Sequence, residues 1–277
     1  MKYLLPILLI MLCSCVQINE SFYIENKDVS LSPISLEPVL MQNIEFLAKK
    51  ALYSDRTQVL YVLDDSSKEI FLYKNNRLVN RIKQGSIGKY SIQRIADIAL
   101  ANDGGLWALD YFEKKIVKID SNGMILTTLT LVDTVNPINF VLLENTGLYV
   151  YDKAKNEILV YEPLTMRYVY SFAKMLFEGN ISISGNKDRL WIYDDQQNKT
   201  YVFSTTGKLL SEQTNKVVYD RFVNALTYEN WAIVNKANGV YLPVSGSKKG
   251  TIDLNGKHLS LLYDKQIFVY EIKYEKE

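Results

Sequence analysis

A five-residue pattern recurs along the chain, with three or four apolar residues followed by Asp or Asn. Its copies begin at positions 60, 106, 148, 190 and 231, so successive copies lie 46, 42, 42 and 41 residues apart. Self-similarity at a fixed period of roughly 40–45 residues is typical of repeat architectures, in which each copy forms one structural unit. The pattern therefore predicts five repeated units over the region 46–256.

Further apolar runs fall at constant positions around each copy. A second run begins ten residues after the start of four copies, and nine residues after the fifth, at 70–73, 116–119, 158–161, 200–203 and 240–242. Turn-forming residues such as Ser121, Asn122 and Gly123 follow, and another run such as 95–100 precedes the pattern. The runs are short, β-branched and aromatic, which favours strands. Four strands in each unit predict an all-β fold, a β-propeller of four-stranded antiparallel blades.

One unit also resembles a known repeat family. Residues 97–126 contain a strand, Asn-Asp-Gly-Gly at 102–105, Leu-Trp-Ala-Leu-Asp at 106–110, and, after a polar stretch, Lys-Ile-Val-Lys-Ile-Asp-Ser-Asn-Gly at 115–123. This succession closely resembles an NHL repeat. The resemblance covers residues from about 46 to 272 through degenerate copies, and it implies an NHL-like β-propeller of the bacterial lipoprotein type.

The number of blades follows from the length left over. After the five patterned units, the runs 259–263 and 267–270 form one more hairpin, which is too short to be a whole blade. Residues 21–45 contain a candidate strand that would complete this last blade, because closing a ring removes exposed sheet edges. We predict a single domain over 21–277 with six blades. The alternative is a five-bladed ring with a C-terminal addition.

The N-terminus carries a targeting signal. After Met1 and Lys2, ten largely apolar residues at 3–12 are too few to span a bilayer, which takes about 20, but suit a signal peptide. The following Leu-Cys-Ser-Cys, at 12–15, resembles the bacterial lipobox. The resemblance implies cleavage of the signal 1–14, lipidation of Cys15 and a tether over 15–20. A plain secretory signal, in which Cys15 has no role, is the alternative.

The composition excludes several functions. The chain has 32 Lys plus Arg and 31 Asp plus Glu, so no positive field indicates nucleic-acid binding. Two Cys and one His exclude a Cys/His zinc cluster, a disulfide scaffold and most His-dependent catalysis. We therefore predict no cofactor. The 20 Tyr are interpreted as residues that pack between blades rather than as a binding surface.

The Asp that closes the pattern invites a metal interpretation, since a ring of carboxylates could bind Ca²⁺. These residues recur once per blade, however, and are expected to lie far apart. Asp side chains at strand ends commonly accept hydrogen bonds from nearby backbone amides. We therefore predict a structural role for the four carboxylates, which belong to Asp64, Asp110, Asp152 and Asp194.

Propeller topology places the loops 110–115, 152–157 and 194–199 on one face, together with the residues that enter each inner strand. Arg94, Asn136, Asn180 and Arg221 occupy these entry positions at spacings of 42, 44 and 41. Arginine and asparagine side chains bind carboxylates and peptide groups. We predict that these four residues contact a partner at the mouth of the channel, with solvated loop residues as the alternative interpretation.

The sequence therefore predicts a non-catalytic scaffold that binds another envelope protein or a peptide. It would be lipid-anchored in the bacterial envelope, at the outer membrane, with its domain in the periplasm or at the surface. The alternative is a metal-dependent hydrolase, lactonase or lyase with a site in the central channel, at Asp97, Asn139 and Asn224. A third option is carbohydrate binding through surface Tyr and Trp. Catalysis has little support, because His258 is the only imidazole.

Overall fold

The computed structural model of the protein describes residues 31–85, 91–143, 146–163, 165, 167–219, 225–229, 232–235, 241–243, 251–255, 257–263 and 265–276. The predicted signal peptide, the tether with Cys15, and the two residues Arg221 and Asn224 lie outside these ranges. Within them all regular structure is β-strand. The described ranges hold no helix of the length and apolar character that a membrane crossing needs.

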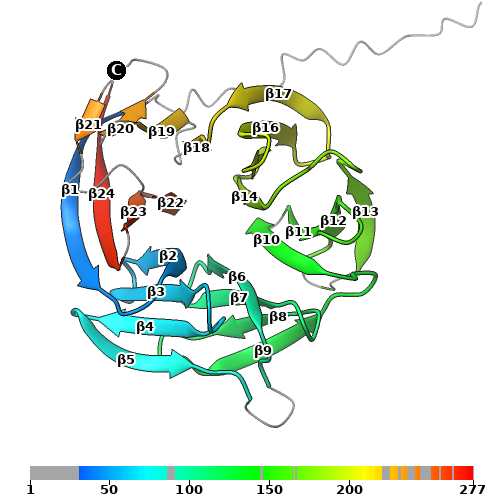
Figure 1. The fold of residues 1–277 in the computed structure, drawn as a ribbon, viewed down its shortest axis with the longest axis horizontal. Helices are drawn as coiled ribbons and strands as arrows, with labels where there is room; N and C mark the ends of the chain where they lie inside the picture. Colours follow the sequence, from blue (N-terminus) through cyan, green and yellow to red (C-terminus); the bar gives the residue numbers. More distant parts are fainter. Residues whose placement is uncertain are drawn as a thin grey trace, which may run out of the picture.

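The described strands form six four-stranded sheets around a central axis (Figure 1). Five of these sheets are each made of four consecutive strands, and we number them blades 1 to 5. Neighbouring strands pair antiparallel throughout. The all-β fold class and the propeller of four-stranded antiparallel blades are therefore confirmed.

The strands of the five consecutive blades have the following bounds. Blade 1 contains β2 (Ala48–Ser54), β3 (Val59–Asp64), β4 (Ile70–Lys74) and β5 (Arg77–Ile82). Blade 2 contains β6 (Ile95–Leu100), β7 (Leu106–Asp110), β8 (Lys115–Ile119) and β9 (Ile125–Thr130). Blade 3 contains β10 (Pro137–Leu143), β11 (Gly147–Asp152), β12 (Glu157–Tyr161) and β13 (Tyr168–Phe172). Blade 4 contains β14 (Ile181–Gly185), β15 (Arg189–Asp194), β16 (Lys199–Ser204) and β17 (Leu209–Thr214). Blade 5 contains β18 (Val218–Tyr219), β19 (Ala225–Glu229), β20 (Ala232–Asn235) and β21 (Tyr241–Pro243).

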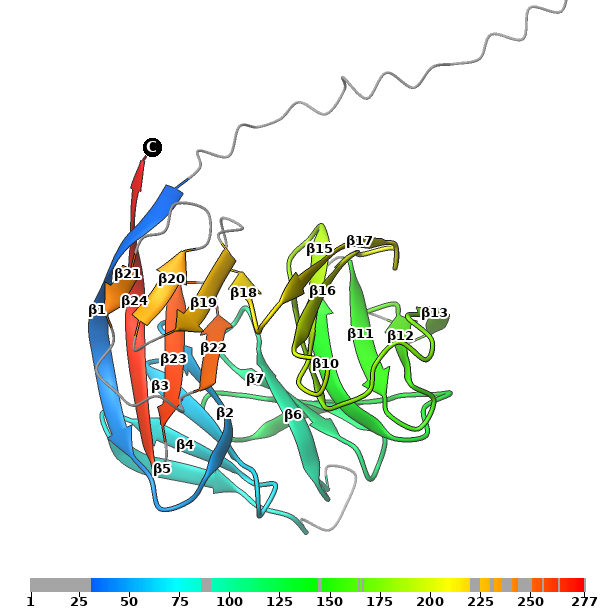
Figure 2. The same cartoon turned by 45° about the horizontal axis from the view of Figure 1, so that its top comes forward.

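The remaining sheet, here called the composite sheet, joins the two ends of the described chain. Its order is β1 (Leu31–Asn43), β24 (Gln266–Lys276), β23 (His258–Tyr263) and β22 (Thr251–Asn255). β1 pairs antiparallel with β24 from Leu31 opposite Lys276 to Asn43 opposite Gln266, and Figure 2 shows the two strands side by side. β1 lies within the range 21–45 that we assigned to closure of the ring. Its backbone covers an edge of β24 that would otherwise be exposed.

The repeated pattern has the same place in four blades. It forms the second strand of blades 1 to 4, in β3, β7, β11 and β15. In blade 5 the matching residues form β20, which is the third strand of its sheet, because the two-residue strand β18 pairs with β19 ahead of it. The fifth unit therefore departs from the arrangement that the spacing predicts.

Apolar clusters lie between neighbouring sheets and join them around the ring. One cluster connects blades 1 and 2, one connects blades 2 and 3, and one connects blades 3 and 4. A further cluster packs Leu60 and Val62 of blade 1 against Ile267 and Val269 of the composite sheet. From the composite sheet to blade 4, neighbouring sheets thus bury apolar faces against each other, and this part of the core is a series of interfaces rather than one central mass.

Buried tyrosines connect the blades. Tyr61, Tyr149 and Tyr161 are among the largest fully buried side chains. The hydroxyl of Tyr61 in blade 1 donates to the carbonyl of Gly104 in blade 2 at 2.9 Å, and that of Tyr149 in blade 3 donates to Thr205 in blade 4 at 2.9 Å. Burial raises the pKa of Tyr61 and of Tyr149 to about 12, so both keep their donor proton at neutral pH. The packing role predicted for tyrosine is confirmed at these positions.

We predict that the contact between blade 1 and the composite sheet limits stability. Leu60→Ala would leave a cavity in this cluster, where Leu60 is 1% exposed. We expect the free energy of unfolding to fall by about 2–5 kcal/mol in urea denaturation. Leu78→Ala, on the outer strand of the same blade, is the matched control, because Leu78 is 53% exposed. Equal losses in both variants would contradict a core at this junction.

Candidate functional site

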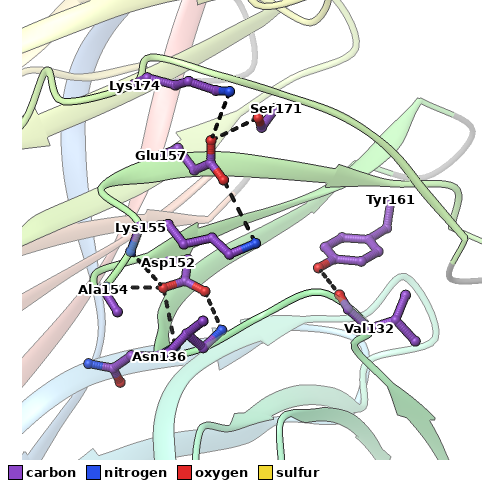
Figure 3. Close-up of polar contacts among 10 residues, drawn as sticks. Val132, Asn136, Asp152, Ala154, Lys155, Glu157, Tyr161, Ser171 and Lys174 are labelled. Atoms are coloured by element: carbon purple, nitrogen blue, oxygen red, sulfur yellow. Dashed lines mark hydrogen bonds and ion pairs between the residues drawn. The ribbon is translucent and has the colours of Figure 1, made fainter.

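In blades 1 to 4, a buried carboxylate organises the loop that connects the second and third strands, on the face of the ring where these loops lie. In blade 3, Asp152 is fully buried and accepts hydrogen bonds from the backbone amides of Val135 at 2.5 Å and Asn136 at 3.1 Å (Figure 3). It also accepts from the amides of Ala154 at 3.0 Å and Lys155 at 3.2 Å. One side chain thus fixes both the loop that follows its own strand and the segment that enters the blade.

The same arrangement repeats in blades 2 and 4. Asp110 accepts from the amides of Gln93, Arg94, Phe112 and Glu113, and Asp194 accepts from those of Glu178, Gly179, Gln196 and Gln197. In blade 1, Asp64 accepts from Ser66 and Ser67 of its own loop. The structural role predicted for these carboxylates is confirmed. Across the described ranges, no group of three or more His, Cys, Asp or Glu side chains could hold a metal ion.

The bonds to the entering segment were missed by sequence reasoning. Each of these amides lies 15 to 17 residues before its Asp in the chain. This offset can be counted in the sequence. It indicates a contact only once the first and second strands of a blade are known to be neighbours.

Opposing effects set the pKa of the Asp194 carboxyl. Burial acts to raise the pKa, because it disfavours the charged form. The backbone amides of Glu178, Gln197, Gly179 and Gln196 outweigh burial and hold the pKa below its ordinary value of 3.8. The carboxylate is therefore charged at neutral pH and stabilises the loop in that form.

Three of the predicted partner-binding residues occupy equivalent places on this face, which we call the loop face. The carbonyls of Arg94, Asn136 and Asn180 each accept from the residue that follows the buried Asp of the same blade, at 3.1, 2.9 and 3.1 Å. The Arg94 guanidinium is exposed and donates to the hydroxyl of Tyr111 at 3.3 Å. Within the described ranges, no side-chain hydrogen bond joins these three residues to one another, and the fourth, Arg221, lies outside those ranges.

One hydrogen bond joins blades 3 and 4 on this face, since the ammonium of Lys153 in blade 3 donates to the Asn180 oxygen at 3.4 Å. Within blade 4, the Asn180 amide donates to Asp195 at 3.2 Å. In blade 3, the carboxylate of Glu157 accepts from Ser171 at 2.8 Å and lies 3.7 Å from the ammonium of Lys174 (Figure 3). These contacts hold the loops in place on the rim of the face.

Exposed apolar side chains also lie on the loop face, and sequence reasoning did not single them out. They lie in the loops between second and third strands or in the segments that enter the inner strands. Their exposed fractions run from 50% for Val132 to 80% for Met175, and the set is Leu47, Phe112, Val132, Val135 and Met175. The signal available in the sequence was a large apolar residue within an otherwise polar loop.

The inner strands use their polar side chains to join neighbouring blades. Asp97 of blade 2 is 1% exposed and lies 2.9 Å from the ammonium of Lys50 in blade 1. Its carboxylate also accepts from the backbone amide of Phe140 in blade 3 at 3.1 Å. Asn139 of blade 3 accepts from the amide of Ile183 in blade 4 at 2.8 Å. The two residues proposed as channel metal ligands are therefore bonded to protein groups, and Asn224 lies outside the described residues.

A cavity of about 350 Å³ lies among the inner strands. Its polar lining comes from the inner strands β2, β6, β10, β14 and β22, the turn after β6, the strand β15 and the segment before β18. The polar residues are Lys49, Lys50, Asp97, Asn102, Asn139, Ser182, Ser184, Tyr193, Lys216 and Asp253. The single imidazole does not line it. His258 is 6% exposed and packs edge-on against Tyr53, with 5.2 Å between ring centroids, and burial lowers its pKa. The cavity thus combines charged and neutral polar groups without a histidine.

Comparison with known proteins supports the fold. No family model and no curated protein matches the chain. A catalytically inactive virginiamycin B lyase from Staphylococcus aureus, solved with quinupristin, is similar at 13% identity and a TM-score of 0.54, covering 89% of this chain and 97% of that one. A streptogramin B lyase structure is 10% identical, with a TM-score of 0.52 and coverage of 84% and 98%. The WD40 domain of Neurospora crassa Pan2 is 12% identical, with a TM-score of 0.52 and coverage of 82% and 76%. At these identities the likeness shows the propeller fold alone.

We predict that Asp194→Asn destabilises the protein in a pH-dependent way. The variant loses the charge and turns an amide group towards backbone N–H donors, so we expect the free energy of unfolding to fall by about 2–3 kcal/mol at pH 7. Because the folded pKa lies below 3.8, the stabilisation is present above that pH and is lost as the pH falls through the folded value. Urea denaturation from pH 7 to 3 should show the two proteins converging below about pH 4.

The matched control for this measurement is Asp188→Asn, in an exposed turn of the same blade. We expect it to change the free energy of unfolding by less than about 0.5 kcal/mol. A pH-independent difference between native protein and Asp194→Asn would contradict the role of the charge.

Proposed function

We propose that the protein is a non-catalytic propeller that binds a protein or peptide on its loop face and is held at the bacterial envelope through a lipid on Cys15. The observation that carries this proposal is the contrast between the buried Asp carboxylates, which are already hydrogen-bonded, and the exposed apolar side chains of the loop face. The Asp64, Asp110, Asp152 and Asp194 carboxylates are bonded to loop groups, whereas the loop face exposes large apolar side chains.

The loop face has the features of a protein-binding surface. Exposed apolar residues that gather on one face, among polar groups, commonly mark interaction sites. Phe112 and Met175 are 65% and 80% exposed, and the cations Arg94 and Lys153 lie on the same face. The buried carboxylates fix the loops, so binding would cost little ordering of the backbone.

The enzymatic alternative, a metal-dependent hydrolase, lactonase or lyase in the channel, has less support. The solved lyases share the fold, but a fold hosts many unrelated functions. Asp97 and Asn139 would have to give up bonds to Lys50, Phe140 and Ile183 in order to bind a metal. Activity that depends on a metal and is abolished by chelation would favour this alternative.

We predict that a photo-crosslinking amino acid at Phe112 captures a partner of defined mass in envelope membranes. The same group at Leu126, which is exposed on the outer strand of blade 2, is the matched control and should capture none. Arg94→Glu combined with Arg221→Glu should reduce capture from position 112 several-fold, because the charge that faces the partner is reversed. Equal adducts from both positions would argue against the loop face.

The anchor is tested separately. Cys15→Ala should abolish incorporation of a labelled fatty acid and release the protein from the membrane fraction, because a lipid chain contributes about 0.8 kcal/mol per buried methylene. Cys13→Ala is the control and should still be labelled, since Cys13 would leave with the signal. Continued labelling of Cys15→Ala would show that the lipobox interpretation is wrong.

A further inference from the structure

The central cavity is lined by two charged residues that are only partly engaged in contacts between blades. Lys216 and Asp253 both line it, and they come from different parts of the ring, the segment between β17 and β18 and the strand β22. Lys50, Asp97 and Asn139, in contrast, are already engaged in contacts between blades. A ligand in the cavity would therefore meet Lys216 and Asp253 as the available charged pair.

The ammonium of Lys216 has spare hydrogen-bonding capacity. It donates to the carbonyl of Ile252 at 3.2 Å, and an ammonium can donate three hydrogen bonds. Burial lowers the pKa of Lys216, the carboxylate of Asp253 raises it, and Lys50 lowers it, with a lowered pKa as the result. The Lys216 amine thus lies in a poorly solvated place, and Asp253 is the neighbouring acid that favours its charged form.

One oxygen of the Asp253 carboxylate lacks a hydrogen-bond donor. Its Oδ2 atom is buried and has no hydrogen-bond partner among the residues that the structure describes. A buried carboxylate oxygen without a donor is unfavourable, so a group that donates to it would be bound favourably.

The chemistry of the pair restricts the ligand. A ligand whose only charged group is a carboxylate would suit Lys216 but would be repelled by Asp253, and one whose only charged group is an ammonium would suit Asp253 but would be repelled by Lys216. A hydroxyl group can accept a hydrogen bond from Lys216 and donate one to Asp253. We propose that the central cavity binds a small neutral polyhydroxylated ligand of monosaccharide size, whose neighbouring hydroxyls bridge Lys216 Nζ and Asp253 Oδ2.

The rest of the lining fits this class of ligand. Ser182 and Ser184 place hydroxyl-bearing residues of β14 at the cavity, and Trp191 and Leu254 add apolar surface. Small-molecule sites commonly combine an apolar lining with a few polar groups that fix orientation, and about 350 Å³ is within their usual size range. This site lies in the ring interior and does not depend on the partner proposed for the loop face.

The test is saturation-transfer NMR on the full chain with glucose, galactose, mannose and N-acetylglucosamine, followed by calorimetric titration of any sugar that binds. Glucuronate and glucosamine are the charged counterparts. We expect at least one neutral sugar to bind with one site per chain and the charged counterparts to bind more weakly. Binding by none of the four neutral sugars, or equal binding of the charged ones, would overturn the proposal.

Two variants test whether Asp253 and Lys216 form the binding site. Asp253→Asn and Lys216→Met should each weaken sugar binding by about tenfold or more, the usual effect of losing a hydrogen bond to a charged group. Thermal melting of each variant checks that the ring remains folded. The matched surface controls, Asp188→Asn and Lys199→Met, should bind as the native protein does, and so should Phe112→Asp on the loop face. Unchanged binding in folded Asp253→Asn and Lys216→Met would locate the sugar elsewhere and overturn the assignment.

Discussion

The buried carboxylates at the ends of the second strands are the interaction on which the loop face depends. A charged side chain can be buried only where several donors surround it, and Asp110, Asp152 and Asp194 each accept from four backbone amides. Two of these amides belong to the segment that enters the blade, so one carboxylate ties the start of each blade to its middle. In blades 2 to 4 the repeated Asp thereby sets the position of the loop and of the entering segment on the loop face.

The polar side chains of the inner strands are held by a different set of contacts. The first strand of each blade faces the axis, where its polar side chains cannot reach bulk water freely. Lys50, Asp97 and Asn139 meet this requirement by bonding to the next blades, which also sets the position of each blade against its neighbour. The two surfaces therefore differ in kind, since the loop face is open surface and the cavity, at about 350 Å³, has room only for a small molecule.

This protein shares its fold with proteins of different kinds, so the fold does not identify its chemistry. Lyases and a WD40 domain share the ring at 10–13% identity, with TM-scores of 0.52–0.54. A propeller needs only short apolar strands, turns and filled interfaces, and many sequences meet these conditions. The function must accordingly be argued from the groups at the face and in the cavity.

The sequence by itself determined the strand order within four blades, the structural use of the closing Asp and the packing of tyrosine, because these follow from local periodicity and strand-end chemistry. Only the tertiary structure decided that the pattern in blade 5 forms a third strand, that the buried Asp of blades 2 to 4 binds the entering segment, and that Lys216 lies near Asp253. Such neighbours are far apart in the chain, and their approach depends on how all the blades pack around the ring. The spacing of residues within one repeat cannot contain that information.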